Sequence, residues 1–170
     1  MTAAFVWTPS GSRPLDELLA ARQACRVEGC AVVTTNGCFD LLHPGHVRFL
    51  QQARALGEVL IVGLNSDESV RQLKGPGRPL LGQEDRAALL AALRCVDHVV
   101  IFAPPLANAL LALLRPDIHC KGGDYTAEAL PEAEVVRQGG GQLRILPFAA
   151  GYSTTGLLGA IREGRPPAAG

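Results

Sequence analysis

Residues 35–46 read Thr-Asn-Gly-Cys-Phe-Asp-Leu-Leu-His-Pro-Gly-His. This stretch lies between the apolar run Ala31-Val32-Val33 and an amphipathic segment that begins at Val47, a pattern that predicts a buried strand followed by a helix. The first N–H groups of a helix have no partners within the helix and the helix dipole is positive there, so an anion is stabilised at that end. The junction therefore predicts a phosphate-binding site.

Three residues of this junction suit phosphate binding. Gly37 lets the main chain approach a ligand closely. His43 and His46 are three positions apart on the opening turn of the predicted helix, so they point from one face toward the same space. Such a pair also occurs as a helix cap or an incidental metal contact, but the preceding strand and the Asn-Gly-Cys-Phe-Asp sequence favour phosphate.

The composition is that of one globular domain. With 170 residues and 48% hydrophobic content, the chain can bury a single core without disulfides or metal. We expect this domain to span residues 14–164, between a flexible N-terminus at 1–13 and a frayed tail at 165–170. The formal net charge is zero, so we expect neither a nucleic acid nor an anionic membrane as a partner.

The five cysteines are odd in number and have no C-x-x-C spacing. This usage predicts free thiols in a reducing cytosol, without a zinc site or a disulfide framework. The first residues carry no secretory signal pattern, and no apolar run nears the ~20 residues of a membrane span. We therefore expect a cytoplasmic protein. Cys38 lies in the phosphate loop, where little room is left for a reactive thiol.

Apolar and amphipathic segments alternate along the chain. An amphipathic helix is expected from Pro14 to just before Gly29. Further strands are expected near residues 30–36, 58–64, 97–102, 117–121 and 142–147, and further helices near 45–56, 66–73, 83–94, 105–114 and 153–163. The alternation predicts an α/β fold: a Rossmann-like, doubly wound, five-stranded parallel sheet with helices on both faces.

The candidate motifs all follow predicted strands. In doubly wound sheets, ligands bind beyond the carboxyl ends of the strands, where the strand order reverses. Residues 35–46 follow the first predicted strand, Asn65 to Asp67 the second, Lys121 to Asp124 the fourth and Gly151 to Thr155 the fifth. Their shared position predicts a single site at one edge of the sheet.

Lysine use is selective in this chain. There are 14 arginines but only two lysines, Lys74 and Lys121, and both precede a glycine in predicted loops at the active edge. Lysine is a compact charge on a flexible stem that can follow a moving phosphate, whereas arginine presents a planar fork. We therefore interpret both lysines as phosphate ligands, with solvated loop charges as the alternative.

Three consecutive hydroxyl residues, Ser153, Thr154 and Thr155, precede the last amphipathic segment. One hydroxyl is expected to cap that helix. The run after Gly151 indicates more than a cap, namely a second helix N-terminus directed at phosphates. Two helix N-termini, two histidines and two lysines would suit an in-line displacement at phosphorus, where positioning and charge stabilisation do nearly all the work.

The residues His43-Pro44-Gly45-His46 fill an H-x-G-H signature, and through it the sequence resembles the nucleotidyltransferase superfamily. Further blocks are similar to one branch, the heptose 1-phosphate adenylyltransferases. They are Val62-Gly63-Leu64-Asn65-Ser66-Asp67, Leu73-Lys74-Gly75-Pro76-Gly77-Arg78-Pro79, Asp85-Arg86-Ala87-Ala88-Leu89-Leu90 with Val96-Asp97, Lys121-Gly122-Gly123-Asp124-Tyr125 and Gly151-Tyr152-Ser153-Thr154-Thr155. The resemblance runs in order from about Leu15 to Ile161.

The resemblance implies transfer of AMP from ATP to a sugar 1-phosphate, D-glycero-D-manno-heptose 1-phosphate, with release of pyrophosphate and no covalent enzyme intermediate. Four catalytic residues are implied: His43, His46, Lys74 and Lys121. The implied nucleotide-binding residues are Asn36, Gly37, Cys38, Phe39, Gly45, Gly122, Gly123, Asp124, Gly151, Tyr152, Ser153, Thr154 and Thr155. The implied acceptor-binding residues are Asp40, Asn65, Asp67, Arg78 and Arg86.

Some of these roles have alternatives. Asp40 either orients the acceptor or holds a loop amide, while Arg78 and Arg86 either bind phosphate or form ion pairs. Mg²⁺ is expected to bind through the nucleotide phosphates, with no metal ligand assigned among the side chains. We expect a homodimer, and a separate sugar kinase that supplies the sugar 1-phosphate.

The alternative functions would each be accompanied by different sequence motifs. A glycerol 3-phosphate cytidylyltransferase would carry an arginine motif before Ser153, where this chain has Ala149-Ala150-Gly151-Tyr152, so ATP is favoured over CTP. A vitamin phosphate adenylyltransferase fits the lysine motifs poorly, and a non-catalytic nucleotide sensor would have a damaged site. The chain departs from the heptose branch at Ala103-Pro104-Pro105-Leu106 and Leu81-Gly82, which bears on the acceptor pocket or a subunit contact.

Overall fold

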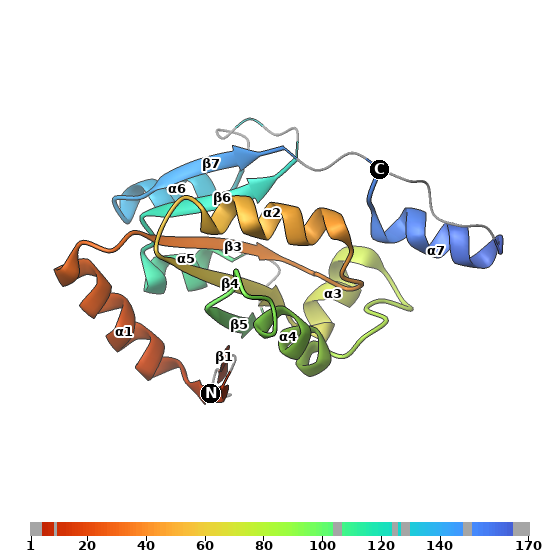
Figure 1. Ribbon diagram of the computed structural model, residues 1–170, viewed down its shortest axis with the longest axis horizontal. Coiled ribbons are helices and arrows are strands. Elements are labelled where there is room, and N and C mark those ends of the chain that lie inside the picture. Colours follow the sequence, from red (N-terminus) through yellow and green to blue (C-terminus); the bar gives the residue numbers. More distant parts are fainter. Residues whose placement is uncertain are drawn as a thin grey trace.

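A seven-stranded sheet lies at the centre of the described chain, with helices on both faces (Figure 1). The structure is a computed structural model, and it describes residues 5–8, 10–103, 107–123, 126, 130–147 and 151–164. The strands are β1 (Phe5–Thr8), β2 (Gly11–Pro14), β3 (Val32–Gly37), β4 (Val59–Asn65), β5 (His98–Phe102), β6 (Ile118–Gly122) and β7 (Gln142–Leu146). The helices are α1 (Leu15–Glu28), α2 (Pro44–Arg54), α3 (Asp67–Lys74), α4 (Gln83–Ala91), α5 (Asn108–Leu114), α6 (Glu132–Gln138) and α7 (Thr154–Arg162).

The five strands β3 to β7 are parallel, and the sheet order is β2-β1-β5-β4-β3-β6-β7. From β3 the chain moves outward through β4 and β5 and then returns to β6 and β7 on the other side of β3. The strand order therefore reverses between β3 and β6, which is where ligands bind in folds of this kind. The predicted doubly wound α/β fold is confirmed.

Alternate residues of each strand face opposite layers of helices. Val33 packs with Leu50 of α2 and with residues of α4, whereas its neighbour Val32 packs with Leu18 of α1 and Leu111 of α5. All are buried, and burial of one such aliphatic side chain contributes about 1.5–3 kcal/mol. Two apolar layers thus hold the sheet rigid and fix the positions of its carboxyl ends.

Helix boundaries follow local sequence signals. Helix α1 ends where Gly29 adopts the left-handed conformation (φ 75°), which glycine reaches at no steric cost. Helix α3 begins after Ser66, whose hydroxyl accepts a hydrogen bond from the N–H of Ser69 at 3.2 Å. Helix α2 begins with Pro44 at its first position, where the missing N–H costs nothing.

Sequence reasoning missed three elements. Strands β1 and β2 form an antiparallel hairpin, and β1 also pairs antiparallel with β5, whereas residues 1–13 were expected to be flexible. Helix α6 lies between β6 and β7, where no helix was predicted. The two lysines also lie outside loops, because Lys74 ends α3 and Lys121 belongs to β6.

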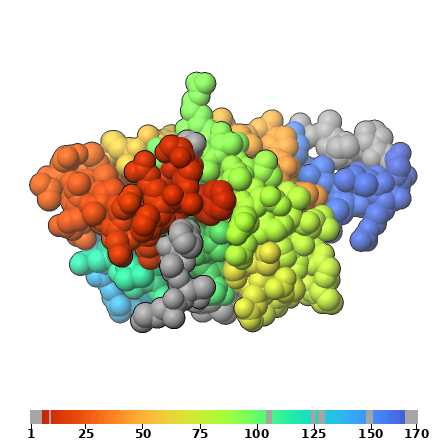
Figure 2. All heavy atoms as spheres, turned by 90° about the horizontal axis from the view of Figure 1, so that it is seen from below, coloured from red at the N-terminus to blue at the C-terminus, as the bar shows by residue number. Residues whose placement is uncertain are grey.

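The C-terminal helix α7 lies apart from the two layers that cover the sheet. Figure 1 shows it beyond the carboxyl end of β3, beside α3 and the start of α2. In the space-filling view the same helix, in blue, forms one end of the molecule, while the N-terminal segments, in red and orange, lie together toward the other (Figure 2). Helices α2 and α7, whose N-termini belong to the predicted phosphate motifs, therefore lie at the same end of the sheet.

Candidate active site

The two histidines of the H-x-G-H motif stack on each other at the start of α2. Their ring centroids are 3.7 Å apart and the ring planes differ by 18°. His43 is the N-cap of α2, and its Nδ1 accepts a hydrogen bond from the N–H of His46 at 3.3 Å. Because Nδ1 is an acceptor, the proton of the neutral His43 ring is on Nε2. The cap thus leaves Nε2–H as a donor for a ligand.

Both rings are held in the neutral form at neutral pH. Burial lowers the pKa of His43. Burial is also the main reason that the pKa of His46 is lowered to about 4, and the charges of His43 and Lys74 act in the same direction. An approaching phosphate would reverse this effect, since an anion favours the protonated ring. The pair can therefore donate hydrogen bonds or take up a proton when a phosphate arrives.

In the loop between β3 and α2, the Phe39 ring lies next to the His46 ring. Phe39 has a positive φ of 43°, which is uncommon for a bulky residue. Its ring is buried, and its centroid lies 5.2 Å from that of His46. A Cβ at Gly37 would lie 3.0 Å from the same ring. Gly37 is therefore needed to admit the Phe39 ring, and Phe39 in turn backs the histidine.

The N-terminus of α7 lies against that of α2. The rings of Tyr152 and His43 are nearly parallel at 6.3 Å, and the Arg48 guanidinium lies 5.2 Å from the Tyr152 ring centroid. A Cβ at Gly45 would lie 3.0 Å from Tyr152 Cβ. Ser153 caps α7 by accepting a hydrogen bond from the N–H of Gly156 at 3.0 Å. Two helix N-termini thus lie side by side, and the predicted hydroxyl cap is confirmed.

Asp40 fastens the segment that follows α3. One carboxylate oxygen accepts a hydrogen bond from the N–H of Leu80 at 2.7 Å, and the other lies 2.7 Å from Arg78 Nε. The carboxylate is buried, with 1% of the side chain exposed. Of the two roles expected for Asp40, the structure bears out the contact with loop amides. Arg78 forms the ion pair that was its alternative role.

Three residues predicted to bind the acceptor, Asn65, Asp67 and Arg86, make side-chain contacts within the protein. The Arg86 side chain is 0% exposed and donates to the carbonyls of Leu81 (3.0 Å) and Cys38 (2.6 Å) and to the Asp67 carboxylate (2.7 Å). Asn65 is buried and donates to the Ser69 hydroxyl at 2.8 Å. Arg86 thus forms the ion pair that was its alternative role, and its guanidinium ties the phosphate loop to α3 and α4.

Lys74 is exposed and close to the histidines. Its charge lowers the pKa of His46 and opposes the rise in the pKa of Cys38. Burial nevertheless raises the pKa of the Cys38 thiol overall, so the structure gives no activated thiolate in the phosphate loop. Lys74 forms no hydrogen bond or ion pair with the rest of the described chain, and its ammonium is available to a ligand.

Lys121 lies at the point where the strand order reverses, but its ammonium is already bound. It donates to Asn36 Oδ1 at 3.0 Å and to Glu132 Oε1 at 2.7 Å. Asn36 lies near the carboxyl end of β3, and Glu132 is the first residue of α6. The structure therefore links Lys121 to the phosphate loop through Asn36. Sequence reasoning did not identify Glu132, whose only local signal is its place after Pro131.

The glycines after Lys121 keep the backbone open at this edge. Gly122 ends β6, and Gly123 has a φ of 132° that favours glycine. The N–H of Gly123 donates to the carbonyl of Leu146 at 3.2 Å. Asp124, the predicted ribose ligand, lies outside the described residues, as do three of the four positions in Ala103-Pro104-Pro105-Leu106. Their predicted roles stay predictions.

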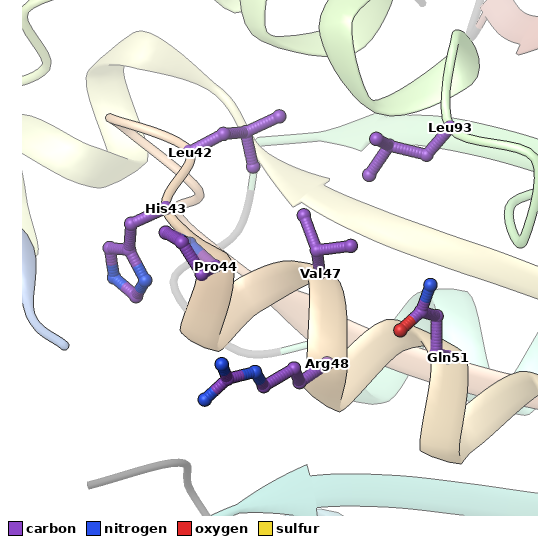
Figure 3. A pocket seen from close by; sticks show the side chains of 7 residues that line it. All are labelled: Leu42, His43, Pro44, Val47, Arg48, Gln51 and Leu93. Atoms are coloured by element: carbon purple, nitrogen blue, oxygen red, sulfur yellow. The ribbon is translucent and has the colours of Figure 1, made fainter. Parts of the chain in front are cut away.

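A pocket of about 550 Å³ runs along the outer side of α2. Figure 3 shows its lining: Leu42, His43, Pro44, Val47, Arg48, Gln51 and Leu93. Most of this surface is apolar, and His43 is the one predicted site residue in it. The pocket therefore adjoins the phosphate site and offers an apolar wall next to His43.

Within the described part of the chain, no group of three or more His, Cys, Asp or Glu side chains converges as a metal site. All five cysteines are free thiols, with Cys120 buried in the core. No helix among the described residues is both long and apolar enough to span a membrane.

The fold and this site together define a class: a Rossmann-like α/β protein in which two helix N-termini and a histidine pair meet at the reversal of strand order. The chain belongs to the cytidylyltransferase-like family, because the model of that family matches residues 34–142. The matched segment holds the H-x-G-H motif, Lys74 and Lys121. The Ser-Thr-Thr segment at the start of α7 lies beyond it.

Curated relatives extend the match over most of the chain. A protein named "Bifunctional protein HldE" from Pelobacter propionicus is 49% identical over 148 residues, which is 87% of this chain and 30% of that protein. The protein of the same name from Geobacter sulfurreducens is 50% identical over 147 residues, 86% of this chain and 30% of its own length. The chain thus spans just under a third of the curated relatives it matches.

A solved structure shares the fold. It is described as the lipopolysaccharide core biosynthesis protein from Thermoplasma volcanium, with 26% sequence identity and a TM-score of 0.58. The match covers 71% of this chain and 97% of the other.

Proposed function

We propose that the chain transfers AMP from ATP to a sugar 1-phosphate, D-glycero-D-manno-heptose 1-phosphate, and releases pyrophosphate. The observation that carries this proposal is the meeting of the α2 and α7 N-termini, with His43 at one and Ser153 at the other, beside the reversal of strand order. Such an arrangement presents many N–H donors and few negative charges to a polyphosphate.

The reaction is a displacement at the α-phosphorus of ATP. An oxygen of the sugar phosphate attacks in line, the bond to the pyrophosphate oxygen breaks, and the electron pair leaves with pyrophosphate. His43 Nε2–H and the His46 ring stabilise charge on the transferred group, and Lys74 neutralises oxygens of the phosphates. Removal of one donor of this kind costs on the order of a hundredfold in turnover.

Mg²⁺ is proposed as the cofactor, held by the phosphates of the nucleotide. The described residues fit this role because Asp40, the buried carboxylate in the loop before the histidines, is committed to Arg78 and to loop amides. When bound, the ion neutralises phosphate charge and favours departure of pyrophosphate. The protein side chains then position the reactants.

The identity of both substrates rests on sequence similarity. Relatives near 50% identity and a structural neighbour from lipopolysaccharide core biosynthesis support a nucleotide-sugar product. The absence of an arginine motif before Ser153 supports ATP over CTP. The acceptor must come from a reaction that places phosphate on the anomeric hydroxyl, so a sugar kinase activity is expected to supply it.

A pyrophosphate-release assay tests the proposal across ATP and CTP, each paired with a panel of sugar 1-phosphates and polyol phosphates. We expect the highest kcat/KM for ATP with a heptose 1-phosphate. A preference for CTP with glycerol 3-phosphate would replace the proposal with the cytidylyltransferase alternative. No release with any pair would reject both.

A further inference from the structure

The ion pair between Lys121 and Glu132 is largely buried, which is unusual for an ion pair whose only role is to stabilise the fold. The side chains are 19% and 4% exposed, and Glu132 Oε1 lies 2.7 Å from the ammonium. The second carboxylate oxygen, Oε2, is buried and has no hydrogen-bond partner in the part of the chain that the structure describes. Burial of a charged pair costs several kcal/mol in desolvation, and the pair repays this only when its remaining atoms are satisfied. Stability alone therefore does not account for Glu132.

The placement of the pair suggests another reason. Lys121 joins Glu132, at the start of α6, to Asn36, next to the phosphate loop on β3. These contacts occupy two of the three N–H donors of the ammonium. Among the described residues nothing accepts from the third donor, and the Lys121 side chain is 19% exposed. Glu132 and Asn36 thus fix where this last donor lies, at the reversal of strand order between β3 and β6.

We propose that Glu132 is a positioning residue that acts through Lys121 and holds its ammonium in place for the nucleotide. The inference rests on the proposed function, because it takes ATP as the ligand of Lys121. Lys121 belongs to the nucleotide half of the site, since its neighbours are Asn36 and the Gly122-Gly123 turn. Lys74, by contrast, ends the helix before the segment held by Asp40.

The charge state of Glu132 agrees with this role. Burial by itself would raise the pKa of Glu132, but the hydrogen bond and the charge of Lys121 outweigh it, and the pKa is lowered. The carboxylate is therefore ionised at neutral pH. His119 lies beside the pair and is fully buried, with Nδ1 2.8 Å from the Thr34 hydroxyl.

A double-substitution cycle separates positioning from folding. Glu132→Met and Lys121→Met each leave one buried charge unpaired, whereas the double variant carries an apolar pair of similar volume, which is often tolerated. Glu132→Gln is a milder second variant that keeps the volume and removes the charge. Glu134→Gln is the matched control, because Glu134 is on the same helix but is exposed, and its partners among the described residues are Arg137 and Gln138.

Calorimetry with MgATP and steady-state kinetics give the two readouts. We expect Glu132→Met to raise the Kd for MgATP and lower kcat/KM at least tenfold, and Glu132→Gln to do so at least threefold. The KM for the sugar phosphate stays within twofold, a split that a general loss of folding would not produce. In the Lys121→Met background, either change at position 132 should cost less than twofold. Glu134→Gln should match the wild type.

Two results would overturn the inference. One is an unchanged Kd and kcat/KM in folded Glu132→Gln. The other is a full tenfold loss when Glu132→Met is added to Lys121→Met, because Glu132 would then act independently of the lysine. A wild-type chain that binds MgATP but releases no pyrophosphate rejects the proposed function alone, since the calorimetric cycle still decides the role of Glu132. A wild-type chain that binds no nucleotide rejects both.

Discussion

The His43 and His46 rings lie 3.7 Å apart, nearly parallel, and the Nδ1 of the first accepts the backbone N–H of the second. The hydrogen bond that caps the helix also determines which nitrogen of His43 carries the proton, and so which nitrogen can donate to a ligand. A residue that only capped the helix would be replaceable by serine or asparagine. The stacking instead places two imidazoles at the positive end of α2.

Removal of either imidazole should disable the reaction and leave the fold intact. We predict that His43→Ala and His46→Ala each lower kcat/KM by at least about a hundredfold, the scale of one lost transition-state donor. Circular dichroism and steady-state kinetics provide the measurement. His98→Gln, at the amino end of β5 and so at the opposite edge of the sheet, is the control. A folded variant of either histidine with near-normal turnover would exclude that residue from the mechanism.

Acid should destabilise the protein through its buried histidines. The pKa values of His46 and His119 are lowered to about 4 and about 3, mainly by burial, while an unfolded histidine titrates near 6.5. Below pH 6.5 the unfolded chain therefore binds protons that the folded chain does not, and stability falls as the pH drops toward the folded values. Urea unfolding at pH 7 and pH 5 measures the loss.

The His46→Gln variant isolates one contribution to this loss. Without a titrating ring at position 46, the difference in stability between pH 7 and pH 5 should shrink by about 1–2 kcal/mol. An unchanged difference would mean that His46 is protonated to the same extent in the folded and unfolded chains, contrary to its burial.

Gly45 should resist replacement even though it lies in a helix. Glycine to alanine in a helix interior normally stabilises by about 1 kcal/mol. At Gly45 the new Cβ would lie 3.0 Å from both His43 Nδ1 and Tyr152 Cβ, so it would push α7 away from α2. We predict no gain in Tm and at least a tenfold loss in kcat/KM.

Gly159→Ala is the matched control for Gly45→Ala. Gly159 lies in α7, and a Cβ there would meet no atom within 4 Å. Activity should therefore be unchanged in this variant. A fully active Gly45→Ala would show that the close approach of the two helix starts is not needed.

Lys74 should not be replaceable by arginine. It is exposed and unpaired within the described chain, so Lys74→Arg should leave Tm unchanged. If the ammonium follows a phosphate during in-line transfer, the planar guanidinium would be misplaced, and we predict at least a tenfold loss in kcat/KM. Arg71→Lys, in the last turn of the same helix, is the control. Wild-type kinetics for Lys74→Arg would identify Lys74 as a solvated charge.

The parallel core of the fold was predictable because its signals are local. Residues 30–33 and 59–64 are apolar runs, and the amphipathic segment between them is long enough to form a crossover helix. The missed helix α6 was also implied, since the parallel strands β6 and β7 require a crossover. The hairpin at Phe5–Thr8 and Gly11–Pro14 was missed because each strand has only four residues, although Phe-Val-Trp-Thr is rich in strand-forming side chains.

The motif residues of the site were predictable, but their partners were not. The H-x-G-H spacing on one helix turn determines how His43 and His46 face each other. The role of Arg86 depends on the carbonyl of Cys38, 48 positions away in sequence, and no local pattern reports that contact. The same holds for Glu132, whose proposed role depends on its contact with Lys121 of the preceding strand. Burial and pairing, not residue type, decide which charges remain free for a ligand.

A competition experiment tests the central claim most directly. The wild-type chain is given equal concentrations of MgATP and MgCTP with D-glycero-D-manno-heptose 1-phosphate and pyrophosphatase, and the nucleotide sugars are identified by mass spectrometry. The ratio of products equals the ratio of the two kcat/KM values. We predict ADP-heptose as the main product and less than a tenth as much CDP-heptose. Equal amounts, an excess of CDP-heptose or no nucleotide sugar at all would contradict the assignment.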